Sequence, residues 1–283
     1  DQHTIVFKPG SSSTVLIGTD GGVFYSENAT DADPIFQQRN KNYNTLQFYT
    51  AAIHPGAGQN KFIGGLQDNG TLLYGGFPLS INSMITGGDG AACFWDEDNP
   101  LVYLTSYYYN RYQMFYNNNQ AAYVDMYSGV FINPADYSSE LNTLFANACD
   151  YWGYKADELL IVDDIPNGGN AYFMDALTGS ETYFSHVKVS PHSPPFSPNL
   201  FLGSVSGKVY KIADIFSMQT VEEIGSPLFP TANVSCIDVG GSEDTLLVTF
   251  SNYGISSVWQ TYDGGSSWAE VEGNLPDMPV RWA

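Results

Sequence analysis

The chain of 283 residues has 10 Lys and Arg against 30 Asp and Glu, which gives a formal net charge of -20 at pH 7, and 43% of its residues are hydrophobic. This acidic excess argues against nucleic acid as a partner and against anionic membrane surfaces, because both are bound through basic patches. No apolar run approaches the roughly 20 residues of a membrane-spanning helix, so we expect no direct membrane span.

Three further features of the sequence bear on the origin of the chain, its cysteines and its location. It starts at Asp1 without a Met or a signal peptide, so we expect a processed or excised piece of a larger protein. Cys93, Cys149 and Cys236 are odd in number and lack metal-ligand spacing, which favours buried thiols over the single disulfide they could form. Few Lys residues beside many Tyr, Asn, Gly and Ser are typical of an extracellular or cell-surface β protein.

The dominant pattern is an internal repeat of short apolar runs. First runs end near a Pro or Gly, and they cover residues 3–9, 48–55, 91–100, 147–152, 186–191 and 234–240. Second runs follow at residues 15–19, 61–65, 101–106, 159–163, 200–204 and 246–250. After a polar, Gly-rich turn comes a third run, and the unit recurs with a period of about 46 residues.

Strand, turn, strand, turn, strand at this period predicts an all-β protein, a β-propeller of four-stranded blades. We expect one propeller domain over residues 1–283, or a fragment of a larger ring. Six blades are expected at residues 3–40, 47–86, 91–135, 145–184, 185–224 and 233–272. A seventh blade is expected to begin at residues 280–283. The stretch 136–147 (DYSSELNTLFAN) predicts a helix inserted between blades.

The last unit contains an eight-residue motif, TYDGGSSW, at residues 261–268. It matches the Asp-box pattern [ST]-x-D-x-G-x-[ST]-W at every defined position, through Thr261, Asp263, Gly265, Ser267 and Trp268. In such a turn the carboxylate accepts backbone N–H groups, Gly permits positive φ and Trp packs between blades. We therefore predict a structural role for this motif, between the third and fourth strands.

The turns between the second and third strands are candidates for a ligand-binding face. Together with the loops that link blades they are expected to project from one face of the propeller. That face is predicted to carry Asp20, Gln67, Asp68, Asn69, Asp89, Asp163, Asp164, Tyr107, Tyr108, Tyr109 and Tyr253. Acidic groups beside aromatic rings suit sugar binding through hydrogen bonds and ring stacking. The alternative is that tight turns simply favour Asp and Asn.

Four ordered segments carry a family resemblance. They are IGTDGGVFYS (17–26), NYNTLQFYTAAIHP (42–55), FIGGLQDNGTLLY (62–74) and ITGGDGAACFWDEDNP (85–100). The series resembles the Asp-box (BNR repeat) β-propellers of large secreted and cell-surface proteins of Bacteroidetes, which are distantly similar to sortilin and to xyloglucanases. The resemblance implies export by type IX secretion, with the secretion machinery and outer-surface components as partners.

The hypotheses for function divide into binding and catalysis. Sialidase activity is disfavoured because its arginine triad would have to come from Arg39, Arg111 and Arg281, the only arginines present. Resemblance to xyloglucanases would make Asp20 a catalytic carboxylate, and hydrolysis needs a second one, for which Asp68, Asp89 and Asp163 are candidates.

The leading hypothesis is a non-catalytic extracellular module that recognises a glycan or a protein at the turn face. We predict no cofactor and no metal site, because residues 67–70 lack the spaced acidic ligands of a calcium loop. Calcium in the axial channel is the one alternative, suggested by the negative charge of this face.

Overall fold

The computed structural model describes residues 1–41, 46–78, 80–194, 196–225 and 227–283. The first four residues of the segment NYNTLQFYTAAIHP lie outside these ranges. The described residues form 24 strands and no helix. The strands build six four-stranded antiparallel sheets, each made of four strands consecutive in the chain. These sheets are the blades of a β-propeller, which confirms the predicted fold class.

The strand bounds are as follows. Sheets one to three contain β1 (Gln2–Phe7), β2 (Val15–Thr19), β3 (Gly22–Ser26), β4 (Gln37–Gln38), β5 (Phe48–Ile53), β6 (Phe62–Leu66), β7 (Gly70–Tyr74), β8 (Ser83–Thr86), β9 (Cys93–Trp95), β10 (Val102–Ser106), β11 (Arg111–Tyr116) and β12 (Asn119–Asp125). Sheets four to six contain β13 (Ala135–Ser138), β14 (Thr143–Asn147), β15 (Glu158–Asp163), β16 (Asn170–Asp175), β17 (Phe184–Val189), β18 (Leu200–Ser204), β19 (Val209–Ala213), β20 (Thr220–Glu223), β21 (Val234–Val239), β22 (Leu246–Phe250), β23 (Val258–Thr261) and β24 (Ala269–Glu270).

The helix predicted over residues 136–147 is wrong. This stretch forms β13 and β14, which pair antiparallel across a turn in which Asn142 has a positive φ of 49°. Leu144, Phe145 and Ala146 are fully buried, so packing against neighbouring strands overrides the local preference. The fourth sheet consequently starts at Ala135 instead of residue 145, and residues 147–152 are not its first strand.

Burial of the second strands explains their continuous apolar runs. Every residue of β10, β14 and β18 is buried, because the third, fourth and fifth sheets each have a neighbouring sheet packed on both faces. Core clusters fill the interfaces between consecutive sheets from the second to the sixth. The three cysteines are buried, free thiols, as predicted.

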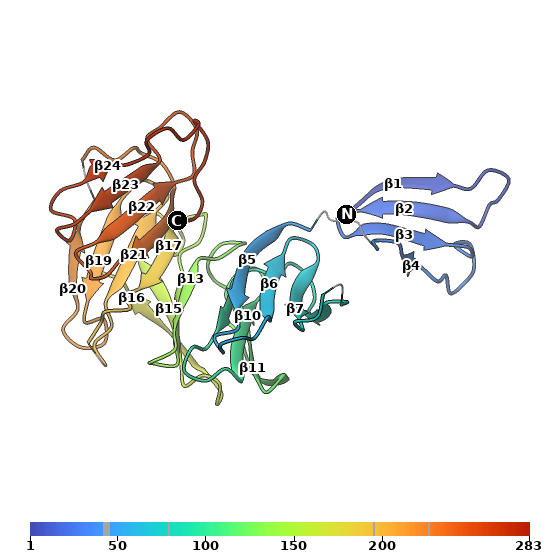
Figure 1. Ribbon diagram of the computed structural model, residues 1–283, viewed down its shortest axis with the longest axis horizontal. Coiled ribbons are helices and arrows are strands. Elements are labelled where there is room, and N and C mark those ends of the chain that lie inside the picture. Colours follow the sequence, from blue (N-terminus) through green and yellow to red (C-terminus); the bar gives the residue numbers. More distant parts are fainter. Residues whose placement is uncertain (42–45, 79, 195, 226) are drawn as a thin grey trace.

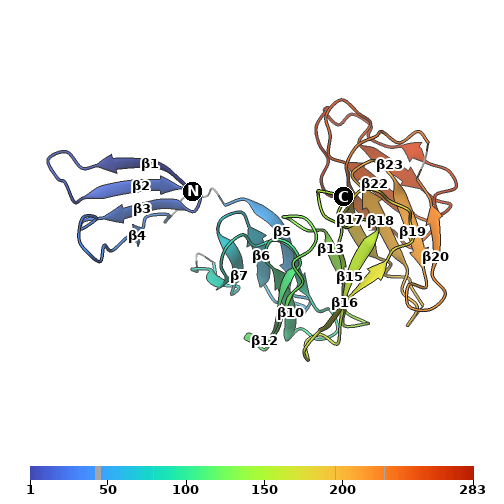
Figure 2. The same ribbon diagram turned by 180° about the vertical axis from the view of Figure 1, so that it is seen from behind.

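The first sheet stands apart from the other five (Figures 1 and 2). None of the four described core clusters includes a residue from it, and all six residues of β1 are exposed. At the other end of the chain, the Val280 N–H donates to the Phe250 carbonyl at 3.1 Å, so residues near the C-terminus lie along the sixth sheet.

Within the described ranges, no helix has the length and hydrophobicity that crossing a lipid bilayer requires.

Candidate functional site

The strand order divides the loops between two ends of each sheet. Because consecutive strands run antiparallel, the turns between second and third strands share one end with the links between sheets. We call this end the turn face; its turns are residues 20–21, 67–69, 107–110, 148–157, 205–208 and 251–257, and its links include 87–92, 126–134, 176–183 and 224–233. Asp163 ends β15, a third strand, and Asp164 follows it. Both therefore lie at the opposite end, and the prediction that they share a face with Asp20 is wrong.

Asp68 and Asp89 lie side by side on the turn face. The Asp68 N–H donates to Asp89 Oδ1 at 2.9 Å, and the Gly70 N–H donates to the Gly88 carbonyl at 2.7 Å. Gly70 has a positive φ of 66°, and a Cβ there would lie 2.1 Å from the Thr86 carbonyl oxygen. Only glycine lets the end of β8 approach this closely, so Gly70 helps to position the link that carries Asp89.

Asp20, Asp68 and Asp89, which we together call the acidic turn, include two carboxylates whose pKa values shift in opposite directions. Burial and the carboxylates of Asp89 and Asp20 raise the pKa of Asp68 above its ordinary value. Asp20 accepts a hydrogen bond from the Asp1 amino group at 2.9 Å and contacts the His3 ring. These two partners lower the pKa of Asp20. Asp20 therefore stays ionised to lower pH than Asp68.

Beside Asp68 and Asp89, aromatic side chains gather in the turns and links of the third and fourth sheets. We call this group the aromatic belt; it consists of Tyr107, Tyr108, Tyr109, Tyr127, Phe131, Tyr151 and Tyr183. Ring centroids lie 5.4 to 6.1 Å apart at the contacts among Tyr107, Tyr108, Tyr109, Tyr127 and Phe131, and the rings of Tyr108 and Phe131 are parallel within 4° at 5.4 Å. Tyr151 and Tyr183 form a second pair, with ring centroids 5.1 Å apart.

The belt meets the acidic turn at Tyr107. A Cβ on Gly88 would lie 2.6 Å from Tyr107 Cε1, so the tyrosine ring rests directly on the backbone beside Asp89. The structure thus brings Asp20, Asp68 and Asp89 into one area with Tyr107 and its neighbours.

Arg111 lies beneath the belt. Its guanidinium carbon is 5.1 Å from the Tyr108 ring centre and 5.5 Å from that of Tyr127, and its Nε is 3.2 Å from Asp125 Oδ1. Cation–π contacts of this kind hold aromatic rings in place. Because Asp125 already forms an ion pair with Arg111, we assign this arginine a structural role and not a role in ligand binding.

Three buried asparagines fix the loops that carry the belt. The Asn133 amide donates to Asn110 Oδ1 at 2.7 Å and to the Asn147 carbonyl at 2.8 Å, and Asn147 donates back to Asn133 Oδ1 at 3.0 Å. The Tyr109 N–H donates to the Phe131 carbonyl at 2.9 Å. A satisfied buried network of this kind rigidifies its surroundings, so turn 107–110 and link 126–134 act as one support.

Several aromatic side chains of the belt and of the loop beside it are exposed to solvent. Tyr127 is 74%, Tyr151 52% and Phe131 39% exposed. In the same loop as Tyr151, Trp152 and Tyr154 are even more exposed, and their backbone N–H groups donate to Asp150 Oδ1 at 2.9 and 3.1 Å. Large exposed apolar patches mark interaction sites in many proteins.

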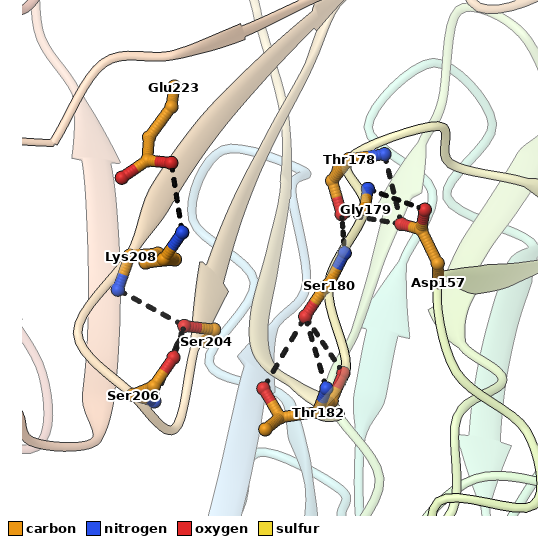
Figure 3. A network of polar contacts seen from close by, with 9 residues as sticks. All are labelled: Asp157, Thr178, Gly179, Ser180, Thr182, Ser204, Ser206, Lys208 and Glu223. Atoms are coloured by element: carbon orange, nitrogen blue, oxygen red, sulfur yellow. Dashed lines mark hydrogen bonds and ion pairs between the residues drawn. The ribbon is translucent and has the colours of Figure 1, made fainter.

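Farther along the turn face the contacts are mainly structural. Asp157 accepts the backbone N–H groups of Thr178 and Gly179 at 3.0 and 2.7 Å, and Lys208 pairs with Glu223 at 3.1 Å (Figure 3). Asp157 thereby joins its turn to link 176–183, and Lys208 joins its turn to the end of β20, so these side chains hold the loops in shape. Tyr253 is exposed in turn 251–257 of the sixth sheet.

Turn 261–268 lies between β23 and β24, at the end opposite the turn face. Asp263 accepts from the Thr261 hydroxyl at 2.8 Å and from the Ser267 N–H and hydroxyl at 2.8 and 2.6 Å. The Gly265 N–H donates to Thr261 Oγ1 at 3.0 Å, and the Trp268 indole N–H donates to the Ile224 carbonyl at 2.7 Å. Every polar contact of Asp263 is therefore local, and Trp268 ties the sixth sheet to the segment that follows the fifth.

The described residues contain no group of three or more His, Cys, Asp or Glu side chains placed to hold a metal ion. In turn 67–69 the Asn69 amide donates to the Gln67 carbonyl at 3.0 Å, so part of the polar capacity of this turn is used internally.

Sequence reasoning missed Tyr127, Phe131, Tyr151 and Trp152 as site residues. The helix expected at 136–147 placed residues 147–152 in a strand, which hid the loop 148–157. The available signal was the density of aromatic residues around short polar loops in this part of the chain.

Comparisons with known proteins agree on the fold. No protein-family model and no curated protein matches the sequence. Among solved structures, the chain is similar to YCF48 from Cyanidioschyzon merolae, with a TM-score of 0.56 and 9% identity over 95% of this chain and 84% of that one. It is also similar to the Cps50 (Swd1) β-propeller domain of Myceliophteria thermophila, with a TM-score of 0.53 and 11% identity over 83% and 69% of the two chains.

A third similar structure is an ancestral GH74 enzyme, with a TM-score of 0.50 and 13% identity. The match covers 99% of this chain but only 50% of the enzyme, so the chain spans half the length of that protein. Likeness at these identities concerns the fold, and the chain is a β-propeller.

Proposed function

We propose that the chain is a non-catalytic binding module whose turn face takes a glycan or a protein ligand. The observation that carries the proposal is the aromatic belt, whose exposed rings adjoin the carboxylates of Asp68 and Asp89. Rings supply stacking surface while carboxylates accept hydrogen bonds from hydroxyl or amino groups.

The wider setting of this proposal rests on sequence resemblance. The chain would be an Asp-box propeller within a larger secreted or cell-surface protein, exported by type IX secretion and working with outer-surface components. The local contacts of Asp263 and Trp268 support the structural role assigned to that motif. The propeller would be one part of a larger ring or protein.

Binding is tested by applying the purified chain to an array of neutral and anionic glycans, with a parallel search for protein partners by cross-linking on intact cells. We expect saturable binding to at least one ligand. An absence of binding in both assays would overturn the proposal and leave a spacer role.

Calcium is proposed only as an accessory ligand. If it binds, addition of calcium chloride raises the unfolding temperature, because a ligand that binds only the folded state stabilises it. An unchanged unfolding temperature would remove calcium from the proposal.

A second candidate function is glycoside hydrolysis. The observation that favours it is that Asp20, Asp68 and Asp89 lie in one area of the turn face, since hydrolysis needs two carboxylates at the scissile bond. In this alternative Asp20 acts as base or nucleophile and Asp68 as acid, with Asp89 supporting the raised pKa of Asp68.

The hydrolase is tested by incubating the chain with xyloglucan and β-glucans and measuring the release of reducing ends. Activity that is lost in Asp20→Asn and kept in Asp33→Asn, which changes an exposed aspartate elsewhere in the first sheet, would replace the binding-only proposal. If no reducing ends are released by the unaltered chain, the hydrolase candidate is discarded.

A further inference from the structure

The geometry points to a specific subsite on the turn face: the exposed rings of Tyr127, Phe131 and Tyr151 form a platform that stacks against pyranose rings of an uncharged glycan. This inference rests on the proposed binding function and names its location and ligand class.

The platform presents ring surface from two neighbouring sheets. Tyr127 and Phe131 come from link 126–134 after the third sheet, and Tyr151 comes from turn 148–157 of the fourth. Tyr109 connects the first two, with ring centres 5.4 Å from Tyr127 and 6.1 Å from Phe131. Besides burial, the Phe131 backbone and Tyr109 both influence the pKa of Tyr151, so its phenol group lies near these two residues. Phe131 stacks on Tyr108 and keeps 39% of its surface exposed.

The rings are held in place before a ligand arrives. Arg111 contacts Tyr108 and Tyr127 from below, and the buried Asn110, Asn133 and Asn147 lock the loops. Side chains ordered in advance lose less conformational entropy on binding. This preorganisation distinguishes the platform from the scattered exposed apolar residues that any soluble protein carries.

Charge selects the class of ligand. The nearby Asp68 and Asp89 and the net charge of -20 repel uronic acids and sulfated sugars. Arg111 offers no compensation, since Asp125 already pairs with it at 3.2 Å. A neutral glycan is not repelled by these carboxylates and needs no cation to bind. Its C–H faces stack on the rings, and its hydroxyl groups donate to tyrosine or carboxylate oxygens.

The experiment measures binding of the chain to neutral polysaccharides (xyloglucan, laminarin and mannan) and to polygalacturonate by affinity electrophoresis and calorimetry. Tyr127→Ala and Tyr151→Ala are compared with Tyr262→Ala, which removes an equally exposed tyrosine from turn 261–268 at the opposite end. Circular dichroism confirms that each variant is folded. Fluorescence of Trp152, read as the difference between the unaltered chain and Trp152→Phe, reports occupancy beside Tyr151.

We expect binding to a neutral polysaccharide, about a tenfold loss of affinity in each platform variant, and no change in Tyr262→Ala. Equal affinity in all variants would overturn the platform while leaving the proposed function standing. Preference for polygalacturonate over the neutral polysaccharides would overturn the ligand class. If neither a glycan nor a protein binds the unaltered chain, the proposed function fails as well.

Discussion

The carboxylate of Asp136 in β13 lies 3.5 Å from Nζ of Lys188 in β17, and its Oδ2 also accepts the Val189 N–H at 2.8 Å. One side chain thus joins the first strands of the fourth and fifth sheets by an ion pair and by a backbone hydrogen bond. Burial raises the pKa of Asp136 even though Lys188 lies beside it, while Asp136 raises the pKa of Lys188. Within this interface, the charged form of each side chain is stabilised by the opposite charge of the other.

Removing Lys188 alone should destabilise the protein. Lys188→Met leaves the partly buried Asp136 carboxylate without its cation, which costs about 1–3 kcal/mol at pH 7. The double variant Lys188→Met with Asp136→Asn removes both charges and keeps an oxygen for the Val189 N–H, so it should recover most of the loss. Urea unfolding midpoints measure the effect, and a double variant less stable than Lys188→Met would contradict this account.

His186 should make stability depend on pH. Burial lowers the pKa of this histidine to about 4, against about 6.5 when unfolded. The unfolded chain therefore binds the proton first, and the stabilising effect of the neutral ring is present above pH 6.5 and lost as the pH falls toward 4. The loss attributable to His186 reaches about 3 kcal/mol at pH 4.

The measurement compares unfolding midpoints between pH 7 and pH 4 for the unaltered chain, His186→Leu and His192→Leu. The pH dependence should become shallower in His186→Leu, whereas in His192→Leu it should match the unaltered chain, because His192 is exposed. Identical slopes in all three proteins would show that His186 is not buried as described.

Gly70 should tolerate no side chain. In Gly70→Ala the new Cβ meets the Thr86 carbonyl at 2.1 Å in a left-handed backbone conformation, at a cost of about 1–3 kcal/mol or more. Gly75→Ala is the matched control, since a Cβ there meets nothing within 4 Å. Thermal unfolding compares the two, and equal stability would contradict the close approach of the end of β8 to Gly70 at the start of β7.

Trp268 should stabilise the junction between the fifth and sixth sheets. Trp268→Phe keeps an aromatic ring against Phe229, whose centre is 4.9 Å away, but loses the indole hydrogen bond to the Ile224 carbonyl. We expect a loss of about 1 kcal/mol in the free energy of unfolding. Trp152→Phe, at an 80% exposed position, should change nothing; a loss of similar size there would argue against a specific role for Trp268.

Sequence periodicity was sufficient to predict the fold class, the number of complete blades and the location of turn 261–268. The reason is that the apolar runs, the Gly-rich turns and the repeat length are short-range patterns within each unit, so they can be recognised without knowing any contact between distant residues. The bulges near the start of β5, β17 and β21 recur for the same reason, because each first strand repeats a similar pattern.

The candidate site depended on tertiary structure. Residues 136–147 have no strong local strand signal, and only pairing with β15 and burial of Phe145 decide that they form β13 and β14. That choice moves Tyr151 from a strand into a turn-face loop and leaves Asp163 at the opposite end. Which aromatic rings meet was likewise decided by the packing of the third and fourth sheets around Asn110 and Asn147, because contacts between residues far apart in the chain depend on how the blades pack.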